Sequence, residues 1–413
     1  MRIKFNPIHI FVIIISLVFS TTGLKAENSS NIRLGVEVLL KEKIDIIKNK
    51  NVGLITNQTG VNSKLVATID LFHQNDIINL VALFGPEHGV RGDLKAGKKG
   101  SHYTDKKSGV QVYSLYGSTR RPTKNMLKDI EVLVYDIQDI GCRSYTFIST
   151  MAYAMQAAKS NDIPFVVLDR PNPLGGKLVD GPILEAKFKS FLGLYPIPYV
   201  YGLTCGELAK LFNNEFNIDC DLTVVKMKGW HRDMQFDETG LEWIPTSPHL
   251  PQSKTAMFYP TTGIIGELHT INIGIGYTLP FELIGTTWID ANGLARELNQ
   301  RNIPGTYFRP IHYSPFYSSF KHKNLQGVQI HILDFAKFSP VEAQIHILTA
   351  LKKLYPEQQI FNGTRTAMFD KVIGTAKVRQ AIQNGKKSKE IIQGWQKDLR
   401  QFEKIRQQYF LYD

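Results

Sequence analysis

The chain has 413 residues, of which 43% are hydrophobic and 21% charged, a globular balance that excludes the low hydrophobicity and high charge of a disordered chain. Its length allows two or three domains, of which we expect two. Its formal net charge of +12 is compatible with an anionic polymer as partner. Three cysteines with no CxxC pair exclude a disulfide scaffold and argue against a cysteine zinc site.

The first 26 residues have the features of a secretory signal peptide. Arg2 and Lys4 precede an apolar run at 10–19, which is short for a membrane-spanning helix of about 20 residues. Small and polar residues follow as far as Ala26, after which we expect cleavage, with an uncleaved anchor as the alternative. The sequence therefore predicts a periplasmic or secreted protein that keeps no stable membrane span after cleavage.

From residue 27 to about 255, short β-branched runs alternate with segments of helical period, a pattern typical of βαβ units. The expected strands are at 52–56, 80–84, 110–115, 132–137, 164–168 and 222–227, and the expected helices at 64–74, 122–128, 146–160 and 205–216. Nearly continuous apolar strands indicate burial on both faces of a parallel sheet. We therefore predict an α/β fold with a doubly wound, mostly parallel sheet over residues 27–255.

The prolines at 245–260 predict a connector rather than a helix, with a domain boundary near 255. Beyond it we expect a Gly-rich loop at 263–276, a helix at 292–301, a strand at 327–333 and a helix at 340–354. This pattern predicts a smaller α+β domain over 256–413.

The last 43 residues carry ten basic and four acidic side chains, and their apolar residues from Ile391 to Tyr409 recur every three to four positions. This spacing predicts a helix with one buried stripe and a solvated basic face. Outside a cytoplasm, cell-wall glycan or lipid headgroups fit a cationic surface better than nucleic acid does. Exposed aromatic residues of the kind that stack on bases are not expected in the tail, so we predict no nucleic-acid partner.

Ligands of open parallel sheets bind beyond the carboxyl ends of the strands, so polar residues at those positions are the first candidates. The loop at 85–92 follows an expected strand and holds Glu87, His88 and Arg91 between glycines. A carboxylate beside a histidine and an arginine suits acid/base chemistry. The alternative is that Glu87 only pairs with Arg91.

Two further strand ends offer polar residues that suit the hydroxyl groups of a sugar. These candidates are Asp136, Gln138, Asp139, Arg143, Tyr145 and Asn172. The alternative is a structural role, with Asp139 paired to Arg143 and Asp136 holding a turn.

A second carboxylate is available in the second domain. Glu267 lies in the expected Gly-rich loop close to His269, and Glu282 is a further candidate. Glycoside hydrolysis requires two carboxyl groups, one to protonate the leaving oxygen and the other to act as nucleophile or as base for water. The alternative is that a glutamate in a Gly-rich loop is a surface residue with no catalytic role.

No cofactor is expected, because the sequence contains no GxSxG, GxxxxGK[ST] or HExxH motif. A metal-dependent hydrolase that uses His88, Asp93, Asp136 and Asp139 stays open as an alternative.

Several of these segments, taken together and in order, resemble the NamZ family of exo-β-N-acetylmuramidases. They are GLITNQTG at 53–60, LFGPEHGVRG at 83–92, DIQDIG at 136–141, LDRPNPL at 168–174 and GWHR at 229–232. The resemblance implies a Rossmann-like N-terminal domain, a smaller C-terminal domain and an active site in the cleft between them. It also implies release of N-acetylmuramic acid from the non-reducing end of peptidoglycan fragments.

Within this resemblance, Glu87 falls on the family's Pro-Glu-His-Gly motif. Glu267 falls on the glutamate of the family's Glu-Gly-Thr-Asn segment, which here reads Glu-Leu-His-Thr, and a following Gly-Arg-Gly-Thr pattern reads Gly-Ile-Gly-Tyr at 274–277. We predict a glycosidase with Glu87 and Glu267 as the carboxyl pair. A noncatalytic protein that binds cell-wall glycan is the alternative from another class, and the sequence leaves the oligomeric state open.

Overall fold

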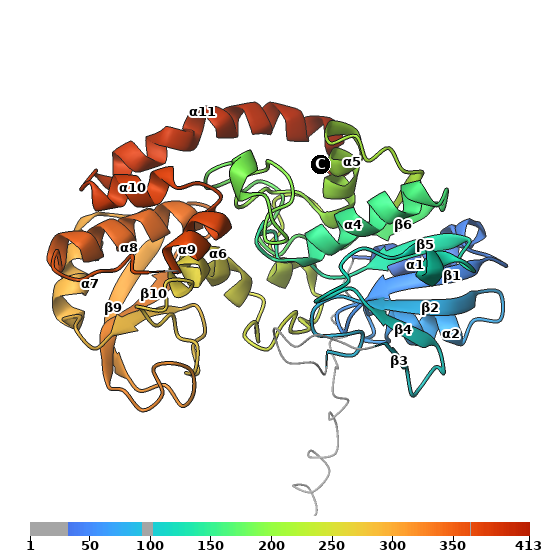
Figure 1. The fold of residues 1–413 in the computed structure, drawn as a ribbon, viewed down its shortest axis with the longest axis horizontal. Helices are drawn as coiled ribbons and strands as arrows, with labels where there is room; N and C mark the ends of the chain where they lie inside the picture. The colour runs from blue at the N-terminus through green and yellow to red at the C-terminus, as the bar shows by residue number, and fades with distance from the viewer. Residues whose placement is uncertain (1–31, 93–101, 364) are drawn as a thin grey trace, which may run out of the picture.

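The computed structural model describes residues 32–92, 102–363 and 365–413 (Figure 1). The predicted signal peptide at 1–26 and Asp93 therefore lie outside the described residues. Among the residues described, none of the helices combines the length and the apolar composition needed to cross a membrane.

The first lobe is built on a seven-stranded sheet. Its strands are β1 (Asn51–Thr56), β2 (Asn79–Gly85), β3 (Tyr103–Thr104), β4 (Gln111–Ser114), β5 (Val132–Asp136), β6 (Phe165–Leu168) and β7 (Leu222–Val225). The order is β3-β4-β2-β1-β5-β6-β7, and every pairing is parallel except that of the edge strand β3. Without β3, the order is the 3-2-1-4-5-6 of a Rossmann fold. The predicted doubly wound sheet is confirmed, and the six expected strands differ from the observed bounds by at most two residues.

Helices cover both faces of this sheet. The helices of this lobe are α1 (Gly35–Glu42), α2 (Thr68–His73), α3 (Lys124–Leu127), α4 (Phe147–Ser160) and α5 (Cys205–Glu215). Alternate strand residues belong to two separate apolar cores, one shared with α1 and α2 and the other with α4 and α5. Because both faces are buried, the carboxyl edge of the parallel strands is left for polar loops.

The second lobe has a three-stranded antiparallel sheet in the order β8-β10-β9. Its strands are β8 (Leu283–Thr286), β9 (Thr306–Tyr313) and β10 (Leu325–Ile332), and its helices are α6 (Thr255–Gly266), α7 (Ala291–Gln300), α8 (Pro340–Leu354), α9 (Arg365–Ile373) and α10 (Lys377–Gln383). The predicted α+β character is confirmed, and α8 has the expected bounds.

The basic tail forms one long helix, α11 (Ser388–Arg406), as its periodicity predicts. Figure 1 shows α11 arching from the second lobe, near α10, across to the first lobe, near α5. The chain end then packs on the first lobe, where the Tyr412 hydroxyl donates to Asp169 at 2.6 Å and accepts from the Met227 amide at 2.9 Å. The tail therefore joins the two lobes.

The prediction for 255–266 is wrong, because these residues form α6 rather than a connector followed by a Gly-rich loop. Pro260 lies inside the helix, where it removes one backbone hydrogen bond. Residues such as Met257, Phe258 and Ile264 are buried in the main core. Their burial outweighs the local cost of the proline.

Candidate active site

The loop after β2 brings Glu87 and His88 to the carboxyl edge of the sheet. His88 and Gly89 have positive φ values of 76° and 75°, which turn the chain back on itself, and the Gly89 amide donates to the Pro86 carbonyl at 3.1 Å. His88 is buried and Glu87 is half-buried. Burial and the Glu87 carboxylate, which accepts a hydrogen bond from Tyr116, together raise the pKa of the Tyr116 hydroxyl to about 12.

Arg91 binds two aspartates that belong to other segments. Its guanidinium donates to Asp105 at 2.9 and 3.0 Å and to Asp70 at 3.2 Å. The bond from Arg91 holds the pKa of the Asp105 carboxyl well below its usual range. These contacts hold the Arg91 guanidinium against Asp105 and Asp70 and fix the loop in place.

Asp136, at the end of β5, is fully buried within an ion pair. Arg170 donates to its two oxygens at 2.6 and 2.9 Å, and Thr68 donates to it at 2.5 Å. Arg170 also reaches the Val61 carbonyl at 2.7 Å. Asp136 therefore ties together the loops that follow three strands, and contact with substrate stays a prediction.

Gln138, Asp139 and Asn172 form part of the same buried framework. Gln138 donates to the carbonyls of Asp139 and Pro171, and Asn172 donates to the carbonyl of Leu203. Asp139 accepts from the Tyr201 hydroxyl and the Gly141 amide, and burial raises its pKa to about 6. These side chains hold the strand-end loops, and their predicted role in sugar binding is not tested by these contacts.

Arg143 is 1% exposed and its guanidinium donates to four backbone carbonyls. The acceptors are those of Pro182, Ile197, Val372 and Ile373, at 2.6 to 3.3 Å. The last two belong to the carboxyl end of α9, where a cation is favoured by the helix dipole. Arg143 therefore links the first lobe to α9 of the second, whereas a role in substrate binding stays a prediction.

Tyr145 lies where the first lobe, the connector and the second lobe meet. Its hydroxyl donates to the Thr246 hydroxyl at 2.7 Å, and its ring contacts that of Tyr259 from α6, edge to face, at 5.6 Å. Burial raises the pKa of Tyr145, and the charge of Glu87 contributes to the shift. Tyr145 therefore contacts Tyr259 of α6 and is influenced by the charge of Glu87.

Glu267, in the second lobe, acts electrostatically on Tyr259. It is the C-cap residue of α6 and is half-buried, and the charge of its carboxylate contributes to the raised pKa of Tyr259. Burial raises the pKa of Glu267 itself, partly opposed by the Arg365 cation. The charges of the two predicted catalytic carboxyl groups therefore act on the two rings of one contact, that of Glu87 on Tyr145 and that of Glu267 on Tyr259.

Glu282 is buried immediately before β8, and its carboxylate lies 3.7 Å from the Lys254 ammonium. Its predicted contact with substrate stays a prediction.

Sequence reasoning missed several residues around the two glutamates. They are Tyr116, Thr246, His249, Tyr259 and Arg365. Three of them come from the connector and α6, which the sequence predicts as an irregular segment. These three residues reach the site only because α6 packs against the first lobe.

No three His, Cys, Asp or Glu side chains gather in a metal-binding arrangement within the described ranges. All three cysteines lie within these ranges, and each is a buried free thiol.

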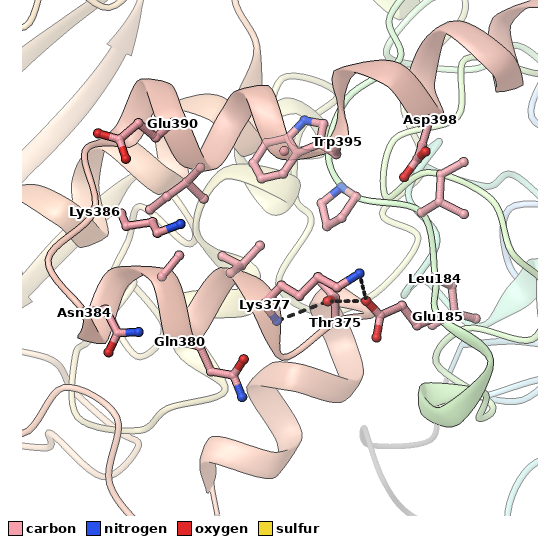
Figure 2. A pocket seen from close by; sticks show the side chains of 16 residues that line it. Leu184, Glu185, Thr375, Lys377, Gln380, Asn384, Lys386, Glu390, Trp395 and Asp398 are labelled. Carbon is pink, nitrogen blue, oxygen red and sulfur yellow. Dashed lines mark hydrogen bonds and ion pairs between the residues drawn. The ribbon is translucent and has the colours of Figure 1, made fainter.

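A pocket of about 510 Å³ lies elsewhere, between α10, α11 and residues 182–185 of the first lobe (Figure 2). Lys377 and Thr375 both contact the Glu185 carboxylate there, at 2.9 and 2.8 Å. None of the candidate residues lines this pocket.

Two family models match the chain over almost all of the described residues. Their descriptions are exo-β-N-acetylmuramidase NamZ, N-terminal, over residues 52–254, and exo-β-N-acetylmuramidase NamZ, C-terminal, over residues 257–412. The peptidoglycan β-N-acetylmuramidase NamZ of Bacillus subtilis (strain 168) is 48% identical over 381 residues, covering 92% of this chain and 91% of that protein.

Two crystal structures of DUF1343 family proteins from Bacteroides fragilis share the fold. One has 48% sequence identity and a TM-score of 0.89, covering 93% of this chain and 100% of that chain. The other has 30% identity and a TM-score of 0.72, covering 93% and 99%.

Proposed function

The chain belongs to the NamZ family of exo-β-N-acetylmuramidases and is a glycoside hydrolase, and we propose that it is secreted and releases N-acetylmuramic acid from the non-reducing end of peptidoglycan fragments. The observation that carries this proposal is the contact between Tyr145 of the first lobe and Tyr259 of α6, on which the charges of Glu87 and Glu267 act, one on each hydroxyl. Secretion is supported by the signal-like first 26 residues.

The environments of the two carboxyl groups suggest different roles for them. Because burial raises the pKa of Glu267, this group keeps its proton to higher pH and suits the general acid. Its proton passes to the glycosidic oxygen as the bond to the anomeric carbon breaks. Glu87, which accepts from Tyr116, is then the carboxylate that either attacks the anomeric carbon or takes a proton from the attacking water.

The test of activity is release of free N-acetylmuramic acid from the disaccharide N-acetylmuramic acid–N-acetylglucosamine by the purified protein, with and without EDTA. We expect release that EDTA does not reduce. Loss of activity in EDTA with recovery on adding a divalent metal would favour the metal-dependent alternative. Saturable binding of muropeptides with no product would favour the glycan-binding alternative.

The roles of the two glutamates are tested with two substrates, the disaccharide and the β-fluoride of N-acetylmuramic acid, whose leaving group needs little protonation. We expect Glu267→Gln to lower kcat on the disaccharide by about 10²- to 10⁴-fold and to keep most activity on the fluoride. We expect Glu87→Gln to lose both.

The matched control is Glu357→Gln, which removes an exposed carboxylate of the second lobe and should leave both activities unchanged. A folded Glu87→Gln variant with wild-type turnover would exclude Glu87 from catalysis.

A further inference from the structure

Two neighbouring aromatic side chains of the second lobe are exposed to solvent. Phe316 and Tyr317, in the loop that joins β9 to β10, are 60% and 49% exposed. Tyr277 stacks on Phe316, with ring centres 5.8 Å apart and planes at 24°. Large aromatic side chains are normally buried, and a group of them on the surface is typical of a binding site.

This aromatic group adjoins the candidate active site. The Tyr317 hydroxyl lies 3.0 Å from Nε2 of His249, and the two rings are nearly parallel, 6.1 Å apart. His249 belongs to the connector, three residues after Thr246, which binds Tyr145. The charge of His88, the neighbour of Glu87 in the chain, contributes with burial to a lowered pKa of His249. The exposed rings are thus joined through the connector at 246–249 to Tyr145 of the candidate site.

The loop is held in this position by the 274–277 segment. The Phe316 amide donates to the Gly276 carbonyl at 2.6 Å, and the Ser318 hydroxyl donates to the Ile275 carbonyl at 3.3 Å. Gly276 has φ +92°, and a Cβ atom there would lie 2.3 Å from the Tyr317 carbonyl oxygen. These contacts anchor the loop, so the two exposed rings are held in a fixed position.

Tyr277 ends this segment, and its ring packs against that of Phe316. It therefore adds a third ring to the aromatic surface of this loop.

We propose that Tyr277, Phe316 and Tyr317 form a platform that stacks on the first sugar of the leaving group, a pyranose of the N-acetylglucosamine type. The proposal rests on the proposed function. The C–H groups on one face of a pyranose make an apolar surface that packs on an aromatic ring, and a rigid ring loses little conformational entropy on binding.

The leaving-group sugar is the occupant because of where the rings lie. Tyr145 and Tyr259 are largely buried, whereas Phe316 and Tyr317 are exposed to solvent. An exo-acting enzyme encloses the terminal sugar and leaves the remainder of the glycan to extend toward solvent, which is where the exposed rings lie.

The test compares the disaccharide with the β-fluoride of N-acetylmuramic acid, which has no leaving-group sugar. We expect Tyr317→Ala and Phe316→Ala each to raise KM for the disaccharide about three- to tenfold and to leave kcat/KM for the fluoride unchanged. Tyr317→Phe keeps the ring and loses the contact with His249, so its KM should stay close to the wild-type value. The matched control is Tyr307→Ala, because Tyr307 is equally exposed, at 49%, but lies against α7.

Melting temperatures of the variants show that each is folded. An equal loss on both substrates, or an unchanged KM for the disaccharide in both alanine variants, would overturn the platform while the wild-type activity keeps the proposed function intact. A wild-type protein that cleaves neither substrate would refute the proposed function and the platform together.

Discussion

Two opposing influences set the pKa of Glu267. Burial raises it, and the cation of Arg365 lowers it. Arg365→Gln removes the charge that favours the ionised carboxylate, so the pKa of Glu267 should rise further. If Glu267 is the general acid, activity is lost as pH rises through its pKa, and the alkaline limb of the kcat/KM profile should move to higher pH by about half a unit.

The profile of Arg365→Gln is best compared with that of Arg296→Gln, which removes an exposed arginine on α7. The control keeps the wild-type alkaline limb. An unmoved limb in Arg365→Gln would mean that the limb reports a group other than Glu267.

At the same scale, the sequence predicted Glu87 and Glu267 but did not separate sugar ligands from framework residues. Asp136 and Asn172 follow buried strands, as ligands would, yet their polar atoms are bound to Arg170, Thr68 and the Leu203 carbonyl. Loops at the edge of a doubly wound sheet need buried hydrogen bonds of their own. Residue type and position alone therefore do not distinguish a sugar ligand from a framework residue.

Among the elements, α8 is capped by a residue of the other lobe. Asp180 accepts from the amides of Val341 and Glu342, in the first turn of α8, at 2.7 and 3.3 Å. Ser339, the N-cap residue, makes no such bond through its side chain. Asp180→Ala should therefore lower the free energy of unfolding by about 1–2 kcal/mol, because one buried and one partly buried amide lose their acceptor.

Urea denaturation of Asp180→Ala and Ser339→Ala at one pH checks this. The serine variant should be within about 0.5 kcal/mol of wild type. Equal stability of the two variants would show that the cap from Asp180 contributes nothing.

Helices and strands were predicted correctly where the hydrophobic pattern was strong. The prediction failed where tertiary packing determined the structure. The strands of the parallel sheet are short apolar runs between turn residues, so their places could be predicted. Helix α6 is apolar around most of its surface and contains Pro260, so it has neither the one-sided stripe nor the composition of a typical helix. Its packing against α8 and the first lobe determines its form, and Glu267 is placed at its end.

For the whole molecule, the relation of the lobes depends on contacts that are distant in the sequence. Arg143 binds the end of α9, Asp180 caps α8, and Tyr412 at the chain end binds Asp169. Two lobes could be predicted from the change of pattern near 255, but these connections could not, because each joins residues more than 150 positions apart. The spacing of Glu87 and Glu267 depends on all three.

Three buried carboxyl groups of this framework also predict how stability depends on pH. Burial raises the pKa of Asp139 and Asp169 to about 6 and that of Asp180 to about 7. Below the unfolded pKa of about 3.9 their contribution to stability is fully present, and it is lost as pH rises through the folded values. His346 acts in the opposite sense, because burial lowers its pKa to about 4 and stability from this group grows up to about pH 6.5.

Since three carboxyl groups oppose one strongly shifted histidine, the free energy of unfolding should fall by about 3 kcal/mol between pH 5 and pH 7. Urea denaturation at pH 5, 6 and 7 measures this slope. Asp180→Asn cannot ionise and should make the slope shallower, most clearly between pH 6 and pH 7, where Asp139 and Asp169 have already passed the midpoint of their ionisation. A wild-type protein that becomes more stable from pH 5 to pH 7 would show that hydrogen bonds to these carboxylates outweigh their burial.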